Sequence, residues 1–155
     1  MNTTFSDYFT CAGQAIIIPP LQTIQMQMSL VCQEWGIPYI NLADIKNPDE
    51  ISQKIEELEP KIILCSIEDI SEESIQKNLQ KLDVGYVAVD ESQVMDPVSG
   101  WCEIRPYCMQ TWKFVRATFK CPLMLLSATM EESSLQRVLG KIFEIYLRKL
   151  GTNFA

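Results

Sequence analysis

The chain has 155 residues, of which 47% are hydrophobic and 21% charged, a composition that excludes disordered and collagen-like proteins and predicts one folded domain. Its 13 Lys and Arg against 20 Asp and Glu give a net charge of −7, so the protein as a whole repels nucleic acid and any contact with one must be local.

No segment of the sequence is typical of a membrane or secreted protein. The longest apolar runs, such as residues 15–20, fall far short of the roughly 20 residues that cross a bilayer. Residues 1–10 are polar and unlike a secretory signal. The six cysteines include no C-x-x-C pair and histidine is absent, so we expect no zinc site and no Ser-His or Cys-His catalysis. We expect reduced thiols, several of them buried, in an intracellular protein.

The first half of the chain predicts two strands and three helices. The β-branched run Ala15 to Ile18, stopped by two prolines, is typical of a buried strand. Apolar residues at three- and four-residue spacing then predict an amphipathic helix over 21–34, with a buried face of Leu21, Ile24, Met28 and Val31. The other elements are a helix from Asn47-Pro48 to Pro60, a strand at 61–66, and a helix that Ser71 caps, with Ile70 and Ile75 packed across its start.

The second half continues the alternation of strands and helices. Its predicted elements are a strand at 84–89, a helix at 112–119, a strand at 123–126, a helix at 131–139 ending at Gly140, and a helical tail at 142–150. Such alternation predicts an α/β fold with a parallel sheet covered by helices on both faces. Functional groups in such folds gather at the carboxyl ends of the strands.

Two acids follow the strand at 84–89. Phosphoryl-transfer sites use this layout, in which an Asp holds the magnesium ion and a Glu orients and deprotonates the attacking water. Asp90 and Glu91 are therefore candidates for these roles. The alternative is that two acids end a strand by chance, and the pair alone does not decide between the two.

Two hydroxyls follow the strand at 123–126. Ser127-Ala128-Thr129 should lie at the same sheet edge as Asp90, because the carboxyl ends of parallel strands meet there. The alternative role is a helix cap ahead of Glu131, and both roles can coexist.

In order and spacing these segments resemble motifs of the DEAD/DEAH-box helicases, over roughly residues 14–140. Residues 15–21 are similar to motif Ia, in which Pro20 and Leu21 would contact the nucleic-acid backbone. Residues 90–93 stand where the family has Asp-Glu-Ala-His, with Gln93 in place of His. Residues 127–129 match motif III. The resemblance implies that Asp90 and Glu91 are catalytic and that Gln93, Ser127, Ala128 and Thr129 couple hydrolysis to movement along the nucleic acid.

Residues 98–107 are similar to the aromatic-rich loop of the RecQ branch, which couples DNA engagement to ATP hydrolysis. An exposed Trp101 beside Arg105 would suit stacking on bases, so both are candidate nucleic-acid contacts. The alternative is that Trp101 packs into the core and Arg105 pairs with Glu103.

The resemblance implies a three-layer RecA-like lobe that uses ATP and Mg²⁺, with the metal held by Asp90 through water. Single-stranded or duplex DNA and the remainder of the helicase would be its partners, and the nucleus its location if the source is eukaryotic. The phosphate-binding loop of the family, with its Gly, Lys and Ser or Thr, is missing. Gly140-Lys141 is followed by Ile142 and is expected to end a helix. The chain should thus lack the first strand and its loop, and end before the second lobe.

These inferences divide the chain into a polar N-terminal remnant at 1–14, a partial ATP-binding lobe at 15–140, and a C-terminal helix and tail at 141–155. The first interpretation is a fragment of a RecQ-like 3′–5′ DNA helicase that is inactive alone. A catalytically dead remnant that binds nucleic acid or protein is the second, and an unrelated α/β domain with accidental matches is the third. A missing strand would leave sheet edges open, so poor solubility is expected.

Overall fold

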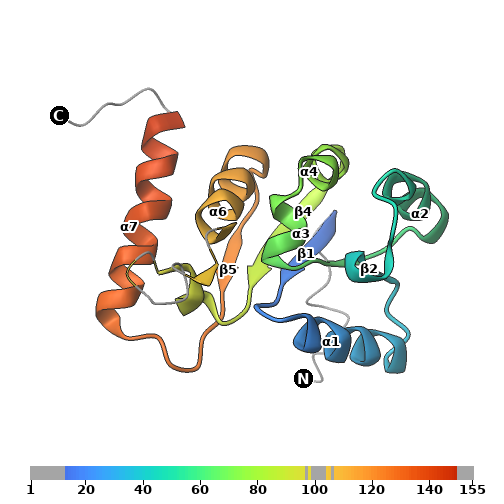
Figure 1. The fold of residues 1–155 in the computed structure, drawn as a ribbon, viewed down its shortest axis with the longest axis horizontal. Helices are drawn as coiled ribbons and strands as arrows, with labels where there is room; N and C mark the ends of the chain where they lie inside the picture. The colour runs from blue at the N-terminus through green and yellow to red at the C-terminus, as the bar shows by residue number, and fades with distance from the viewer. Residues whose placement is uncertain (1–12, 97, 99–103, 106, 150–155) are drawn as a thin grey trace, which may run out of the picture.

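In the computed structural model, five parallel strands form one sheet in the order β2-β3-β1-β4-β5 (Figure 1). The structure describes residues 13–96, 98, 104–105 and 107–149, with only the backbone described over 141–149. The strands are β1 (Gln14–Ile18), β2 (Tyr39–Asn41), β3 (Ile62–Leu64), β4 (Val84–Val89) and β5 (Leu123–Leu125). All four strand pairs are parallel, which confirms the predicted α/β class.

Helices cover both faces of this sheet, giving three layers (Figure 1). One face carries α1 (Gln22–Glu34). The other layer contains α2 (Glu50–Leu58), α3 (Ile67–Ser71), α4 (Glu73–Leu79), α6 (Tyr107–Thr118) and α7 (Glu132–Lys149). Short 3₁₀ helices follow β2 and β4, namely η2 (Leu42–Asp44) and η3 (Ser92–Met95).

Alternate side chains of β1 enter two separate cores, because successive residues of a strand point to opposite faces. Ile16 and Ile18 belong to the larger core under the helices of the second layer, which includes Trp112 of α6. Ala15 packs in the smaller core, with Cys32 of α1. Both faces of the central strand are therefore buried, as a parallel sheet requires.

Helix α1 differs from the amphipathic helix that the sequence predicts. Its fully buried side chains include Gln25 and Ser29, whereas Leu21 and Val31 of the predicted apolar face are exposed. The Nε2 of Gln25 donates to Asn41 Oδ1 at 2.7 Å and to the Leu64 carbonyl at 3.2 Å. A buried amide is stable only when it is hydrogen-bonded, so these two contacts fix α1 against the ends of β2 and β3.

Two other element predictions are wrong. The third helix is two helices: α3, which Ser66 begins through a reciprocal capping box with Asp69, and α4, which starts at Glu73, so Ser71 ends a helix instead of capping one. Gly140 does not end a helix, because α7 continues through it to Lys149. The predicted start of the second helix is confirmed to within a turn: α2 runs from Glu50, and just before it the Asn47 side chain accepts from the Asp49 amide while the Asn47 carbonyl accepts from the Glu50 amide, as a cap does.

Strand β2 has no counterpart among the predicted elements. Three of the described cysteines, Cys32, Cys65 and Cys108, are buried, as expected. No helix in the described part of the chain combines the length and hydropathy needed to span a membrane.

Candidate functional site

The turn after β4 is built by backbone and side-chain contacts at the carboxyl edge of the sheet. The Asp90 amide donates to the Ile18 carbonyl at 3.0 Å, which extends the β1–β4 pairing to the first acid. The Asp90 Oδ1 then accepts the amide of Glu91 at 2.9 Å. Glu91 has a φ of 47°, a left-handed conformation that few non-glycine residues adopt and that is often found at functional turns.

Gln93 links the acids of β4 to the hydroxyls that follow β5. Its Nε2 donates to the Glu91 carboxylate, and its Oε1 accepts from Ser127 Oγ at 2.6 Å. The Thr129 amide donates in turn to Ser127 Oγ at 3.3 Å. Glu91, Gln93 and Ser127 thus form one hydrogen-bonded chain at one sheet edge, as expected for neighbouring parallel strands. Ala128 lies between the two hydroxyl-bearing residues.

Arg105 connects its own segment to the turn after β1. Its Nη1 donates to the carbonyl of Pro20, the residue before the Leu21 that caps α1. Its Nε lies 3.5 Å from Glu68 Oε1, at the start of α3. The candidate contacts Pro20, Leu21 and Arg105 are therefore neighbours. Trp101 and the alternative partner Glu103 lie outside the described residues.

A family model described as "DEAD/DEAH box helicase" matches residues 5–138. The chain belongs to the DEAD/DEAH box helicase family. No curated protein matches the sequence. Among solved structures, the helicase domain of Hef from Pyrococcus furiosus is 17% identical with a TM-score of 0.65, covering 89% of this chain and 29% of its own. The DEAD-box helicase Mss116, solved with single-stranded RNA and UDP-BeF, is 17% identical with a TM-score of 0.57, at 91% and 29% coverage. The chain thus spans less than a third of the length of these neighbours, which share its fold.

A magnesium-nucleotide site has a half that holds the metal and a half that holds the phosphates, and the helicase residues present here fit the metal half. Magnesium in such sites is held by one or two carboxylates together with phosphates and water, and Asp90 can supply such a carboxylate. Within the described residues, no group of three or more acidic or cysteine side chains could hold a metal by itself. The phosphate half does not fit, because the sequence has no Gly-rich loop with its Lys and Gly140-Lys141 lies inside α7.

One acid of this helicase domain, Asp96, accepts several side-chain hydrogen bonds in the described part of the chain but was not predicted from the sequence. Asp96, directly after η3, is buried and pairs with Arg137 of α7, with Arg137 Nη2 at 2.7 Å from Asp96 Oδ2. Hydrogen bonds from Arg137 and Ser134 hold the pKa of Asp96 well below its ordinary value, although burial alone would raise it. No motif could have revealed the pair, because its members are 41 residues apart.

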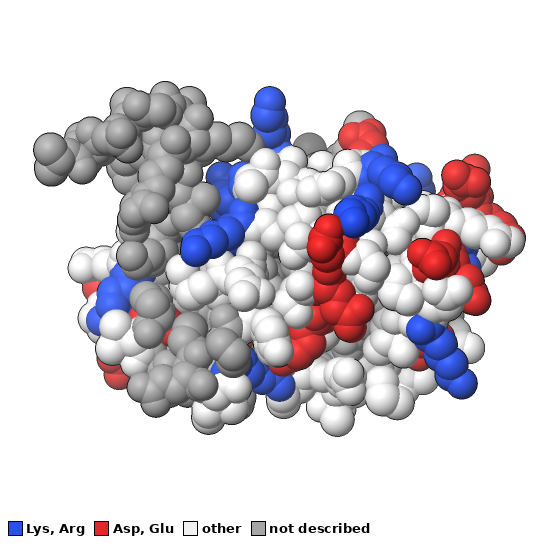
Figure 2. Space-filling model, turned by 45° about the horizontal axis from the view of Figure 1, so that its top comes forward, with Lys and Arg blue, Asp and Glu red and all other residues white. Residues whose placement is uncertain are grey.

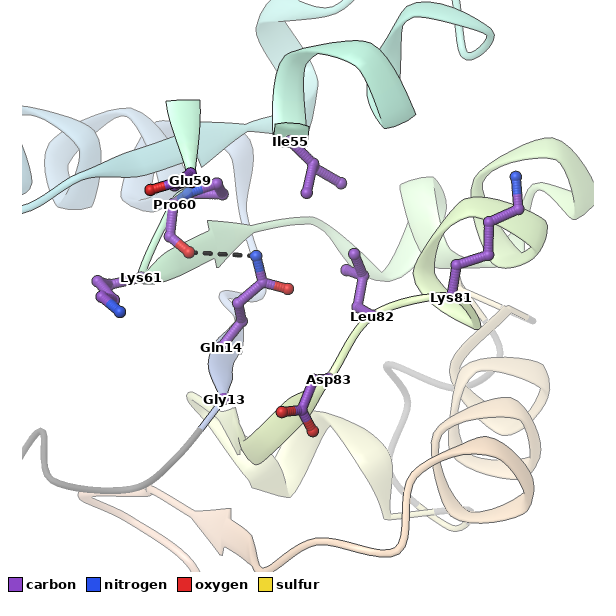
Figure 3. A pocket seen from close by; sticks show the side chains of 9 residues that line it. All are labelled: Gly13, Gln14, Ile55, Glu59, Pro60, Lys61, Lys81, Leu82 and Asp83. Carbon is purple, nitrogen blue, oxygen red and sulfur yellow. Dashed lines mark hydrogen bonds between the residues drawn. The ribbon is translucent and has the colours of Figure 1, made fainter. Parts of the chain in front are cut away.

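The surface of the described residues carries no continuous basic patch on the face shown in Figure 2, where Lys and Arg are interspersed with acids. A cavity of about 400 Å³ lies between the starts of β1, β3 and β4, among Gln14, Pro60 and Leu82 (Figure 3). Because the strands are parallel, this amino edge is opposite to Asp90 and Ser127. The cavity is therefore separate from the candidate helicase site.

Proposed function

We propose that this chain is part of the first motor lobe of an ATP-dependent, RecQ-like helicase that moves 3′ to 5′ on DNA. The observation that supports the proposal best is the hydrogen-bonded chain Glu91–Gln93–Ser127, because it joins an acid pair suited to phosphoryl transfer to the hydroxyls of the next strand. Without the phosphate-binding loop and the second lobe, the chain alone is expected to unwind nothing and to hydrolyse little or no ATP.

Each side chain of the site has a role in this proposal. Asp90 would hold magnesium, and a bound magnesium nucleotide would supply the phosphoryl group, with the metal neutralising the charge of the phosphates. Glu91 orients the attacking water and accepts its proton. Gln93 links Glu91 to Ser127, since its amide nitrogen donates to Glu91 while its carbonyl oxygen accepts from Ser127. A change at Glu91 would therefore be transmitted to Ser127. Ala128 and Thr129 complete that connection.

Nucleic acid would lie across the same edge. Pro20 and Leu21 lie at the start of α1, where backbone amides can face phosphates. The contact between Arg105 and the Pro20 carbonyl keeps Arg105 next to this turn. DNA follows from the resemblance to RecQ, whereas Mss116 was solved with single-stranded RNA. The two nucleic acids therefore need a direct comparison.

Filter binding of the purified chain to single-stranded DNA and RNA of one sequence tests this proposal. We expect retention at low salt that falls as salt rises, because phosphate contacts release counterions, with DNA held more tightly than RNA. Arg105→Ala should weaken retention, and the control Lys77→Gln, which changes an exposed ion pair on α4, should not. Tighter retention of RNA would contradict the RecQ assignment, and no retention of either would contradict the nucleic-acid role.

A catalytically dead remnant that binds nucleic acid or a protein is the second candidate. It is favoured by Gln93 in place of the family His and by the net charge of −7. The transcript upstream of Met1 distinguishes the two: an open frame with a Gly-Lys-Ser/Thr loop supports the motor lobe, and an in-frame stop supports the remnant. DNA-stimulated ATP hydrolysis by the chain, abolished by Asp90→Ala, would contradict both the remnant and the expected inactivity.

A further inference from the structure

The Asp96 carboxylate receives hydrogen bonds from α7 and from the backbone of its own loop. Its Oδ2 accepts from Ser134 Oγ at 2.6 Å and from Arg137 Nη2 at 2.7 Å, both in α7. Its Oδ1 accepts from Arg137 Nε at 2.9 Å and from the Val98 amide at 3.1 Å. The side chain is 2% exposed, so these donors replace the water that a carboxylate otherwise requires.

The contacts of Asp96 join the two segments that leave the carboxyl edge after β4 and β5. Close to the sheet, the segments are joined where Ser92 N donates to the Leu126 carbonyl at 2.8 Å and where Ser127 Oγ donates to Gln93 Oε1 at 2.6 Å. Farther out, Asp96 joins them again through α7. Residues 92–96 and 126–137 are therefore bonded to each other at both ends.

The two junctions differ in how strongly water competes for their hydrogen bonds. The Gln93–Ser127 bond is exposed, and an exposed hydrogen bond between neutral groups adds little net stability because water competes for both partners. The Asp96–Arg137 junction is charge-assisted, with two nitrogens on one carboxylate, an arrangement that fixes direction as well as distance. The outer junction can therefore hold the inner contact in place.

We propose that Asp96 and Arg137 are positioning residues that keep Ser127 bonded to Gln93 by fixing α7 against η3. The importance of that bond for energy coupling rests on the proposed function, but its dependence on Asp96 and Arg137 does not. Asp96 also receives the Val98 amide, so the segment that follows η3 is fixed to the same point. A rearrangement of either segment would then change the link between Glu91 and Ser127.

Nuclear magnetic resonance of the ¹⁵N-labelled chain tests this inference without nucleotide or nucleic acid. The reporters are the side-chain amide of Gln93 and the backbone amide of Thr129, which donates to Ser127 Oγ. Ser127→Ala defines the position of the Gln93 reporter when the contact is lost, and Gln93→Ala defines that of the Thr129 reporter. In Arg137→Gln we expect both reporters to move most of the way to those positions, and in Arg137→Lys, which keeps the charge but loses the two-nitrogen geometry, less than half of the way.

Two further variants separate positioning from general stability. Lys77→Gln breaks an exposed ion pair with Glu73 on α4 and should leave both reporters in place. Asp96→Asn should move them as Arg137→Gln does; if it fails to fold, Arg137→Gln decides, because the Arg137 side chain is 39% exposed and tolerates replacement. Unmoved reporters in a folded Arg137→Gln protein whose α7 resonances shift would overturn the proposal. Loss of nucleic-acid binding would contradict the proposed function alone.

Discussion

Strands β3 and β5 each contain three apolar residues, yet only β3 is completely buried. β3 pairs on both sides, with β2 and β1, and the buried side chain of Gln25 in α1 bonds to its last carbonyl. β5 pairs with β4, and no other strand pairs with it in the described part of the chain. Its central residue, Met124, is 52% exposed. Two strands of the same apolar type thus lie in different places, β3 inside the sheet and β5 at its edge.

This difference separates the stability of the domain from its chemistry. An all-apolar strand is typical of the interior of a parallel sheet, and at an edge it invites association with other strands. The candidate site, Asp90 to Gln93 with Ser127 to Thr129, lies at the ends of β4 and β5, next to the edge that β5 forms. The β2-β3-β1 half carries more of the buried core. Substitutions in the two halves should therefore have different consequences.

The largest expected effect is that of a truncation inside β3. Ile63 is completely buried in the larger core, and Ile63→Ala should lower the free energy of unfolding by about 2–5 kcal/mol, through lost burial and the cavity left behind. Met124→Ala in β5 should change it by less than about 0.5 kcal/mol, since the side chain is already half in water. Urea denaturation of both variants makes this comparison. Equal losses would show that β5 is as well packed as β3.

A smaller loss is expected at the start of β1, where the two halves meet. Gly13 has a φ of +103°, and a Cβ there would lie 2.6 Å from the Asp83 carbonyl oxygen. Gly13→Ala should therefore cost more than the roughly 1–2 kcal/mol of a left-handed backbone alone. Gly36→Ala is the matched control, because Gly36 also has a positive φ, of +64°, but no atom within 4 Å of the added Cβ. Similar melting temperatures for the two variants would contradict the close approach of β1 to β4.

The sequence predicts the sheet better than the details of its edges. Apolar runs such as Ala15 to Ile18 identify four strands, because strands of a parallel sheet covered by helices are apolar at nearly every position. β2 was missed because its three residues end in Asn41, whose side chain is needed to receive Gln25. The Asp90–Ser127 neighbourhood was predictable from parallel strand geometry. The Asp96–Arg137 pair was not predictable, because it depends on the path of α7. The sequence predicts that a helix ends at Gly140, which lies inside α7.

Asp96 should make a pH-dependent contribution to the stability of the half of the domain that contains β4 and β5. Hydrogen bonds from Arg137 and Ser134 keep the pKa of Asp96 below the ordinary value, so the stabilisation is present above roughly pH 4 and is lost as the pH falls towards the lowered pKa. Asp96→Ala should cost about 1–3 kcal/mol at neutral pH, because buried donors lose their acceptor. Its difference from the unmodified protein should shrink below about pH 4.

Thermal melts across this pH range measure that difference. The control is Glu73→Gln, which removes a carboxylate whose pKa is also lowered, chiefly by a hydrogen bond from Lys77, but which is exposed. Its effect on the melting temperature should be much smaller, because water screens an exposed pair. A difference between Asp96→Ala and the unmodified protein that stays constant into acid would show that the carboxylate is not held in its charged form.

The smallest expected effect on stability, and the clearest on association, is that of a charge at the edge that β5 forms. Met124→Lys should leave the free energy of unfolding within about 0.5 kcal/mol and reduce self-association, because a lysine on an edge strand opposes pairing with another strand. The matched control is Leu58→Lys on α2, which charges an equally exposed apolar side chain on a helix instead of a strand. Sedimentation velocity of the two variants distinguishes the causes. If both reduce association equally, exposed apolar area is responsible; if only Met124→Lys does, the domain associates through the open edge of β5.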